Sequence, residues 1–278
     1  MSSHPIAESI ANCPNCGARN TGAWCAGCGQ EAESGPHASV RAIRRQWERI
    51  RHSIVALVIH PGQLTAEFRD GKRARSVSPW RLAINLVTFF FVLSFVTDFR
   101  VANLARQDPG GALAGAISEA ASLAHVDIST YIERVDRRFD AIYTVMIALL
   151  VAIAALTARL THWRPGARWS VHFVFALHLI AWSFIINFVY LVAMRLFKLS
   201  AFMVGTDPSV SLGSALLLLV VILWQFGYVL VASRRVYADS WMGGSVKAAV
   251  MVIVKLVAGN VLARLSFWLA VQSLVHVA

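Results

Sequence analysis

The chain has 278 residues, of which 57% are hydrophobic and only 15% are charged, with a formal net charge of +11 and a mean hydropathy of +0.58. Soluble domains usually carry about 25% charged residues, so the composition argues against an ordinary soluble enzyme or binding domain. The apolar residues lie in long blocks, which is typical of an all-α protein that crosses a membrane several times.

The first segment of the chain is a polar region that contains all four cysteines. They form two Cys-x-x-Cys pairs, each followed by Gly: Cys13, Cys16, Cys25 and Cys28. No apolar run of signal-peptide length precedes them, so the N-terminus is expected to stay in the reducing cytoplasm, where such a cluster favours a metal site over disulfides. Two pairs can supply four thiolates to one tetrahedral Zn²⁺, which predicts a small structural zinc ribbon over residues 1–36. An iron–sulfur or redox dithiol role is the alternative.

The chemistry expected of this module is limited. Four thiolates leave no open coordination position, so the zinc is expected to fold the tail and not to catalyse. Residues 1–36 contain one Arg against three Glu, and thiolates add negative charge, so nucleic acid is disfavoured as a partner.

Residues 37–78 are predicted to form a basic amphipathic helix and a linker. Apolar residues recur every three or four positions from Val40 to Leu57, and Pro61-Gly62 ends the pattern. Trp47 lies in the apolar stripe, and basic side chains occupy much of the remaining surface: Arg41, Arg44, Arg45, Arg49 and Arg51. Such a helix is typical of one that lies on an anionic inner leaflet. Packing against the protein's own membrane helices is the alternative.

Residues 79–278 are predicted to form a transmembrane helical domain, with Pro79 in the first turn of the first span. Five segments are apolar and long enough to cross: about 80–99, 141–160, 170–194, 212–232 and 247–270. Lys255 and Arg264 interrupt the fifth, which is therefore the weaker candidate. Between the first two spans we expect a short helix over 112–124. A second helix, capped by Thr130 and Glu133, should run from about residue 130 into the second span.

The orientation follows from the distribution of Lys and Arg. With the N-terminus inside, 17 basic residues lie on the cytoplasmic side and seven on the outer side. This excess predicts an N-in, C-out protein of the cytoplasmic (inner) membrane.

Polar residues inside the spans are candidates for a functional site. Lys255 has no Asp or Glu to pair with in any span interior, and the simpler interpretation is that it reaches toward an interface. The candidate intramembrane polar site comprises His172, Asn187, Tyr190, Gln225 and Lys255. Hydrogen bonding between helices is the simpler role for the polar faces of spans three and four. His162 and His172 flank the inner end of span three, without an acid beside them in the sequence.

Three linked motifs resemble a known family. They are the cysteine pattern of residues 13–30, the run His60-Pro61-Gly62-Gln63-Leu64-Thr65, and Ser78-Pro79-Trp80-Arg81-Leu82 before a Phe-rich span. Together they resemble an uncharacterised family of bacterial membrane proteins, the domain of unknown function 3667, over roughly residues 13–95. Ser76 stands where that family is expected to have Tyr. The resemblance implies the architecture and no activity.

No enzyme signature is present: there is no HExxH, no GxSxG and no phosphate-cradling Gly-rich loop, so the protein is not expected to be an enzyme. The predicted function is an integral membrane interaction or regulatory protein, in which the zinc module docks a cytoplasmic protein partner. The alternative is a transporter or channel that uses the polar faces of spans three and four with Lys255. A homo-oligomer is compatible with the sequence.

Overall fold

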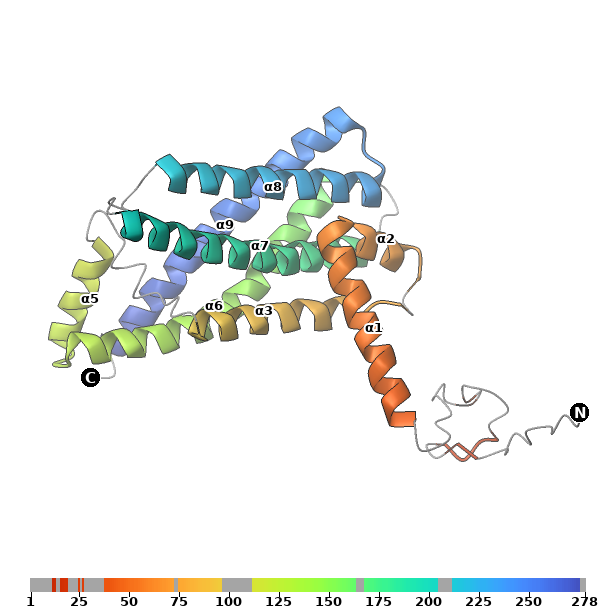
Figure 1. The fold of residues 1–278 in the computed structure, drawn as a ribbon, viewed down its shortest axis with the longest axis horizontal. Helices are drawn as coiled ribbons and strands as arrows, with labels where there is room; N and C mark the ends of the chain where they lie inside the picture. Colours follow the sequence, from red (N-terminus) through yellow and green to blue (C-terminus); the bar gives the residue numbers. More distant parts are fainter. Residues whose placement is uncertain are drawn as a thin grey trace, which may run out of the picture. The chain divides into compact units, whose positions relative to one another are not determined.

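A computed structural model describes most of the chain: residues 12, 13, 16–19, 25, 27, 38–72, 75–96, 112–163, 168–204 and 212–275. The chain divides into two compact units, Met1–Arg51 and His52–Ala278. In the described residues the regular structure is helical, apart from one antiparallel bridge between Asn12 and Arg19. The predicted all-α class is therefore confirmed (Figure 1).

The basic amphipathic helix forms as α1 (Ala38–Ile59) and ends before Pro61, as the apolar pattern predicts. In its N-terminal half, Ile43 and Trp47 are 70% and 66% exposed. Arg44 pairs with Glu48 one turn later at 3.1 Å, an exposed contact of the kind that adds little to stability. Ile43 and Trp47, the two largest apolar side chains of this half, are thus not packed into the described part of the protein.

The predicted linker contains a further helix, α2 (Gln63–Arg69), which the sequence did not reveal. Gly62 precedes it with a φ of 77°, a left-handed conformation that glycine adopts without strain. Seven residues are too few for a helical period to be recognised, and Pro61-Gly62 reads as a turn.

Among the described residues, four helices are long and apolar enough to cross a membrane: α6 (Ile128–Thr161), α7 (Trp169–Val204), α8 (Leu212–Tyr237) and α9 (Trp241–Val275). They indicate an integral membrane protein. The fifth predicted segment, interrupted by Lys255 and Arg264, lies within α9 and forms one of the longest helices.

The first predicted span, residues 80–99, corresponds to α3 (Pro79–Val96), which begins at Pro79 as expected. Its apolar stretch Pro79–Leu93 is shorter than the four long helices, and residues 97–99 lie outside the described residues. Four long helices and one shorter helix therefore stand in place of the five predicted spans.

The segment between α3 and α6 contains the short helix expected there, α5 (Ala112–Leu123). The start of α6 differs from the prediction, because the cap is Asp127 and not Thr130. Asp127 is in an extended conformation and its carboxylate accepts a hydrogen bond from the Ser129 backbone N–H at 2.9 Å. The bonds from Ser129 hold the pKa of this carboxyl below its usual range. The helix then continues without a break into the second apolar segment, as predicted.

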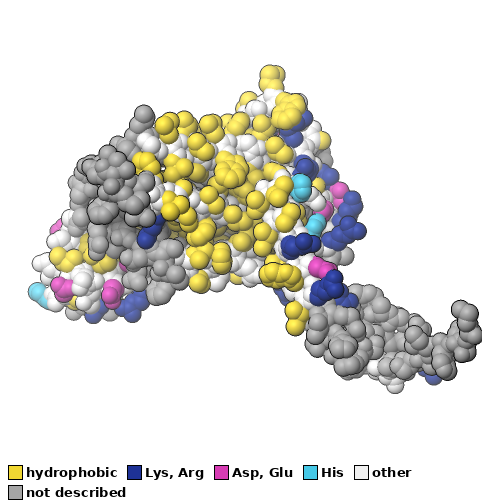
Figure 2. Space-filling model, viewed as in Figure 1, with side chains coloured by type: hydrophobic (Ala, Val, Ile, Leu, Met, Phe, Trp, Pro, Cys, Tyr) yellow, Lys and Arg dark blue, Asp and Glu magenta, His cyan; other side chains and the backbone are white. Residues whose placement is uncertain are grey.

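The core of the second unit is built around α7. Within its apolar stretch 67% of the residues are buried, against 33% in α6 and 28% in α8 and in α9. Trp182 of α7 stacks on Tyr228 of α8 with ring centroids 3.9 Å apart. The outer helices therefore keep apolar faces exposed, and hydrophobic side chains cover the middle of the surface in Figure 2.

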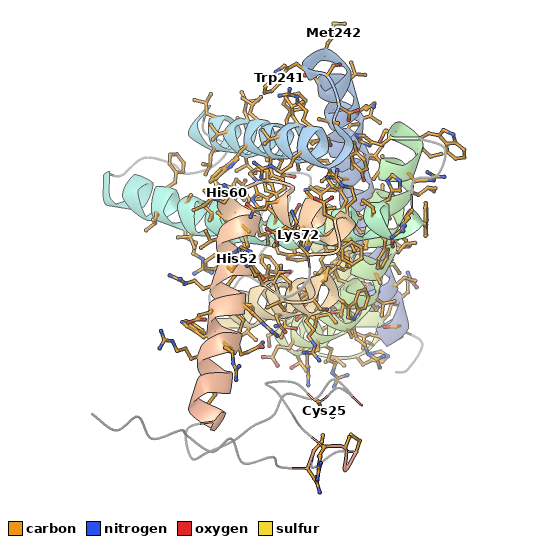
Figure 3. All side chains as sticks on the ribbon, turned by 90° about the vertical axis from the view of Figure 1, so that its right-hand side faces the viewer. Cys25, His52, His60, Lys72, Trp241 and Met242 are labelled. Carbon is orange, nitrogen blue, oxygen red and sulfur yellow. The ribbon has the colours of Figure 1, made fainter. Side chains whose placement is uncertain are left out.

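One end of this helical bundle carries exposed tryptophans beside basic side chains. The connections α6–α7 and α8–α9 both lie there, since His162 and Asp239 are 2.9 Å apart, and Trp80 at the start of α3 stacks on Phe173. We call it the basic end and define it by its exposed tryptophans and neighbouring cations: Trp80, Trp163, Trp169, Trp241, Arg81, Arg159, Arg168, Arg234, Arg235 and Lys247. Met242, next to Trp241, points away from the bundle (Figure 3), whereas the Trp241 ring lies over the guanidinium group of Arg234. Tryptophan and Arg/Lys together mark membrane–water interfaces.

Candidate functional site

Three of the four predicted metal ligands come together in the first unit. The Sγ atoms of Cys13, Cys16 and Cys25 all lie within 4.8 Å of one another, and those of Cys16 and Cys25 are 3.5 Å apart. Sulfur ligands about 2.3 Å from a tetrahedral zinc are separated by roughly 3.8 Å, whereas a disulfide joins its sulfurs at about 2.05 Å. The sulfurs are too far apart for a disulfide and close enough to share one ion, so the cluster could hold a metal.

The backbone around the cluster is a tight turn. The Cys13 N–H donates to the Ala18 carbonyl, the Gly17 N–H donates to the Cys13 carbonyl, both at 2.8 Å, and Gly17 has a φ of +72°. A Cβ on Gly27 would lie 3.5 Å from the Cys16 sulfur and 3.3 Å from Ala18 Cβ, so this position also has little room. Cys28, the fourth predicted ligand, lies outside the described residues.

The predicted membrane-surface residues share the N-terminal part of α1. Arg44, Arg45, Arg49, Arg51 and Trp47 are all exposed there. The side chain of Arg41 lies outside the described residues.

A buried ionic cluster lies at the basic end. The Asp239 carboxylate is 2.9 Å from His162 Nε2 through one oxygen and 2.6 Å from Lys247 Nζ through the other. The His162 side chain is fully buried, and burial lowers its pKa to about 4, with the attraction of Asp239 offsetting part of the effect. His162 is therefore neutral near pH 7, and Lys247 balances the charge of Asp239. The cluster fixes the end of α6 to the α8–α9 connection.

His172 belongs to this same end of the bundle. Its Nδ1 lies 3.0 Å from the Tyr237 hydroxyl, and the Tyr237 ring stacks on His162 with centroids 4.0 Å apart. The acid that sequence reasoning lacked for the two histidines is thus Asp239, with Tyr237 between them. No spacing rule links a residue to a partner so far along the chain.

Lys255 lies inside the bundle and does not reach an interface. It is 8% exposed, and its ammonium or amine nitrogen donates hydrogen bonds to the Ser183 hydroxyl at 2.8 Å and to Gln225 Oε1. Two members of the predicted polar site, Gln225 and Lys255, therefore meet. The others do not join them, since Asn187 is exposed, Tyr190 is half-buried and His172 lies at the basic end.

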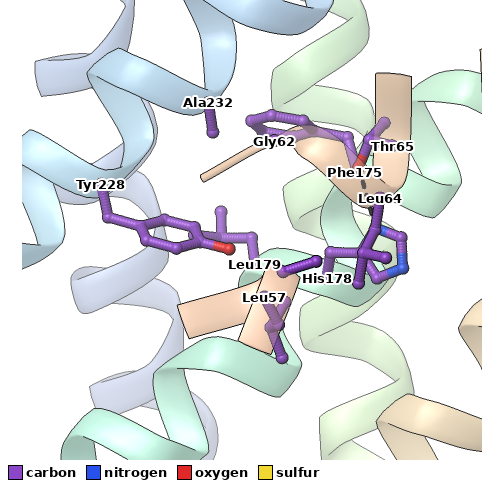
Figure 4. A pocket seen from close by; sticks show the side chains of 10 residues that line it. Leu57, Gly62, Leu64, Thr65, Phe175, His178, Leu179, Tyr228 and Ala232 are labelled. Atoms are coloured by element: carbon purple, nitrogen blue, oxygen red, sulfur yellow. Dashed lines mark hydrogen bonds between the residues drawn. The ribbon is translucent and has the colours of Figure 1, made fainter. Parts of the chain in front are cut away.

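The turn and helix that follow α1 dock on the bundle through buried contacts. Thr65 Oγ1 of α2 is 2.8 Å from His178 Nδ1 of α7, and Gly62 lies directly against the backbone of Ala232 in α8. Two guanidinium groups bind carbonyls across the same junction: Arg235 donates to the Pro61 carbonyl at 2.9 Å and Arg69 to the Val236 carbonyl at 2.5 Å. A small pocket with mainly apolar walls lies between residues 56–65 and the helices α7 and α8 (Figure 4).

The comparison with known families concerns this same part of the chain. Residues 48–94 match the family model described as "Protein of unknown function (DUF3667)". This stretch, which we call the DUF3667 segment, is therefore similar to that family of unknown function. The DUF3667 segment contains the second half of α1, α2 and most of α3, so the resemblance is confirmed for two of its three motifs. The cysteine cluster and the four long helices lie outside the match.

No curated protein and no solved structure matches the chain. The structure nevertheless gives the DUF3667 segment a physical role. Its Gly62 and Thr65 hold α2 against α7 and α8, and its α3 packs along α7.

Proposed function

We propose that this protein is an integral interaction or regulatory protein of the cytoplasmic (inner) membrane. Residues 1–36 form a zinc ribbon in which Cys13, Cys16, Cys25 and Cys28 bind one structural Zn²⁺. Residues 37–78 are a basic helix and linker, and residues 79–278 cross the membrane five times, N-in and C-out. The observation that carries the proposal is the convergence of three cysteine sulfurs on one point.

The donor set favours docking over chemistry at the metal. Four thiolates fill a tetrahedral zinc and leave no position for water or substrate, so the ion's role is to fold the module. A folded ribbon of this size offers a cytoplasmic protein partner a fixed surface. Its acidic composition disfavours nucleic acid, and the protein is not proposed to be an enzyme.

The basic end supports the orientation. Exposed tryptophans and Arg/Lys side chains together are typical of the cytoplasmic interface of a membrane bundle. The exposed Ile43 and Trp47 with the neighbouring arginines of α1 fit an anionic inner leaflet, which would hold the tail close to the membrane.

The docking proposal is tested by affinity capture of the intact protein from membranes, with metal analysis of the same sample. The Cys25→Ser/Cys28→Ser double variant is expected to lose zinc and the partner proteins captured by wild type. Glu48→Gln, an exposed change on α1, is the matched control and should keep both. If the double variant loses zinc but captures an unchanged set of proteins, the docking role is wrong.

The alternative function, a transporter or channel, is favoured by one observation: Lys255, Gln225 and Ser183 meet inside the bundle. It fails if Lys255→Met and Asn187→Leu leave each measured solute flux unchanged in reconstituted vesicles.

A further inference from the structure

Lys255 joins three of the four long helices at one nitrogen atom. From α9 it donates to the Ser183 hydroxyl of α7 and to the Gln225 side-chain carbonyl of α8. Ser183 and Gln225 are 5% and 3% exposed, so the whole group is enclosed by the bundle. A polar group in this setting cannot bond to solvent and must find its hydrogen-bond partners within the protein.

The surroundings offer no negative charge. The interiors of the neighbouring helices, residues 141–158 of α6, 173–194 of α7 and 215–232 of α8, contain no Asp, Glu, Lys or Arg. In the described part of the chain no carboxylate pairs with Lys255. A buried ammonium without a counter-ion is costly inside a membrane.

The remaining ionisable side chains on the helices around Lys255 are either uncharged types, Tyr and His, or charged residues many positions away along their helix. The interiors hold the side chains Tyr143, His178, Tyr190 and Tyr228, and His178 is engaged by Thr65. On α9 itself Arg264 lies nine residues on and Lys247 eight residues before, where it pairs with Asp239. On α3, which packs against α7, the one charged side chain is Arg81 near the basic end.

The hydrogen-bond count fits an uncharged amine. The hydroxyl hydrogen of Ser183 is donated to the Leu179 carbonyl at 2.7 Å, so its oxygen accepts from Lys255. Gln225 also accepts through its carbonyl oxygen. A neutral amine has two N–H groups, which these two acceptors satisfy, whereas an ammonium has a third that finds no acceptor in the described residues.

We propose that Lys255 is a proton-exchange site within the membrane bundle, held as a neutral amine by Ser183 and Gln225. Its nitrogen lone pair takes up one proton to give an ammonium with a third N–H, and no other bond is broken. The ligand of the site is the proton itself. Ionisable side chains inside membrane spans mark ion and proton pathways, with Asp, Glu and His the usual members of proton relays. The proposal stands independently of the docking role of the cysteine module.

The lysine content of the chain makes a direct test feasible, because there are only four: Lys72, Lys198, Lys247 and Lys255. The intact protein is labelled with nitrogen-15 at lysine Nζ and placed in lipid nanodiscs at pH 9, where ordinary lysines remain ammonium. Nitrogen NMR separates amine from ammonium by chemical shift. One of the four signals is expected at the amine position and should be absent from Lys255→Met.

Lys72→Met, a change at an exposed lysine outside the bundle core, is the matched control and should retain the amine signal. If Lys255→Met does not fold, a variant with Lys72, Lys198 and Lys247 all changed to Arg leaves Lys255 as the single lysine, and its one signal decides the question. An ammonium signal from Lys255 at pH 9 in either experiment overturns the proposal.

Discussion

Replacing Cys25 by Ser is expected to remove the bound zinc and the folded form of the cysteine module together. In zinc-dependent modules of this size the metal supplies the folding free energy, with apparent values of about 10–16 kcal/mol at pH 7. Cys25 is 2% exposed and its sulfur faces that of Cys16, so its loss removes a ligand from the centre of the cluster. The measurement is zinc per chain by elemental analysis of the purified intact protein.

Cys13→Ser should give the same loss, because Cys13 is equally buried and belongs to the other pair. Arg19→Gln, an exposed change at the bridge, is the control and should retain one zinc per chain. Full zinc occupancy in Cys25→Ser would show that the three sulfurs are not ligands of one ion.

Gly62→Ala is expected to destabilise the helical bundle far more than Gly71→Ala. Both glycines have left-handed backbones, with φ of +77° and +79°, and each substitution therefore costs about 1–2 kcal/mol in strain. At Gly62 the new Cβ would also lie 2.7 Å from the Ala232 carbonyl oxygen and 2.8 Å from its Cα, while at Gly71 nothing lies within 4 Å. Overpacking of this kind adds about 1–3 kcal/mol.

The comparison is made by thermal unfolding of both variants in the same detergent. The total expected for Gly62→Ala is about 2–5 kcal/mol, against about 1–2 kcal/mol for Gly71→Ala. Equal shifts of the unfolding midpoint temperature in the two variants would mean that the Pro61-Gly62 turn does not pack on α8 as described.

The long helices were predictable because their signal is local. A block of about 20 apolar residues identifies a membrane helix without reference to the rest of the chain. The same holds for α1, whose apolar period is complete within 22 residues. By contrast, α2 is defined by contacts with partners far along the chain: Thr65 and His178 are 113 positions apart.

Hydropathy alone did not rank the predicted spans correctly. Lys255 lowered the expectation for the fifth segment, because the sequence displays the cost of a buried amine but not its acceptors on α7 and α8. Conversely, the Phe-rich first segment looked strong, yet the apolar stretch of α3 is the shortest of the five.

The candidate sites also differ in whether their residues are close together in the sequence. The cysteine spacing predicted three residues that the structure places together, because the two cysteines of a Cys-x-x-Cys pair are only three positions apart in the sequence. For the cluster of His162, Asp239 and Lys247, the sequence indicated the histidine but not its acidic partner. Asp239 follows two further membrane helices in the sequence, so no local pattern links it to His162.

The most direct test of the account is the topology of the intact protein, measured with a fluorescent protein that is dark outside the cytoplasm. The docking role requires the cysteine module to be cytoplasmic, and five spans then place the other end outside. A fusion before Met1 is expected to be bright and a fusion after Ala278 dark. A dark fusion at Met1 would contradict the cytoplasmic zinc module, and a bright fusion at Ala278 would show that the number of spans is not odd.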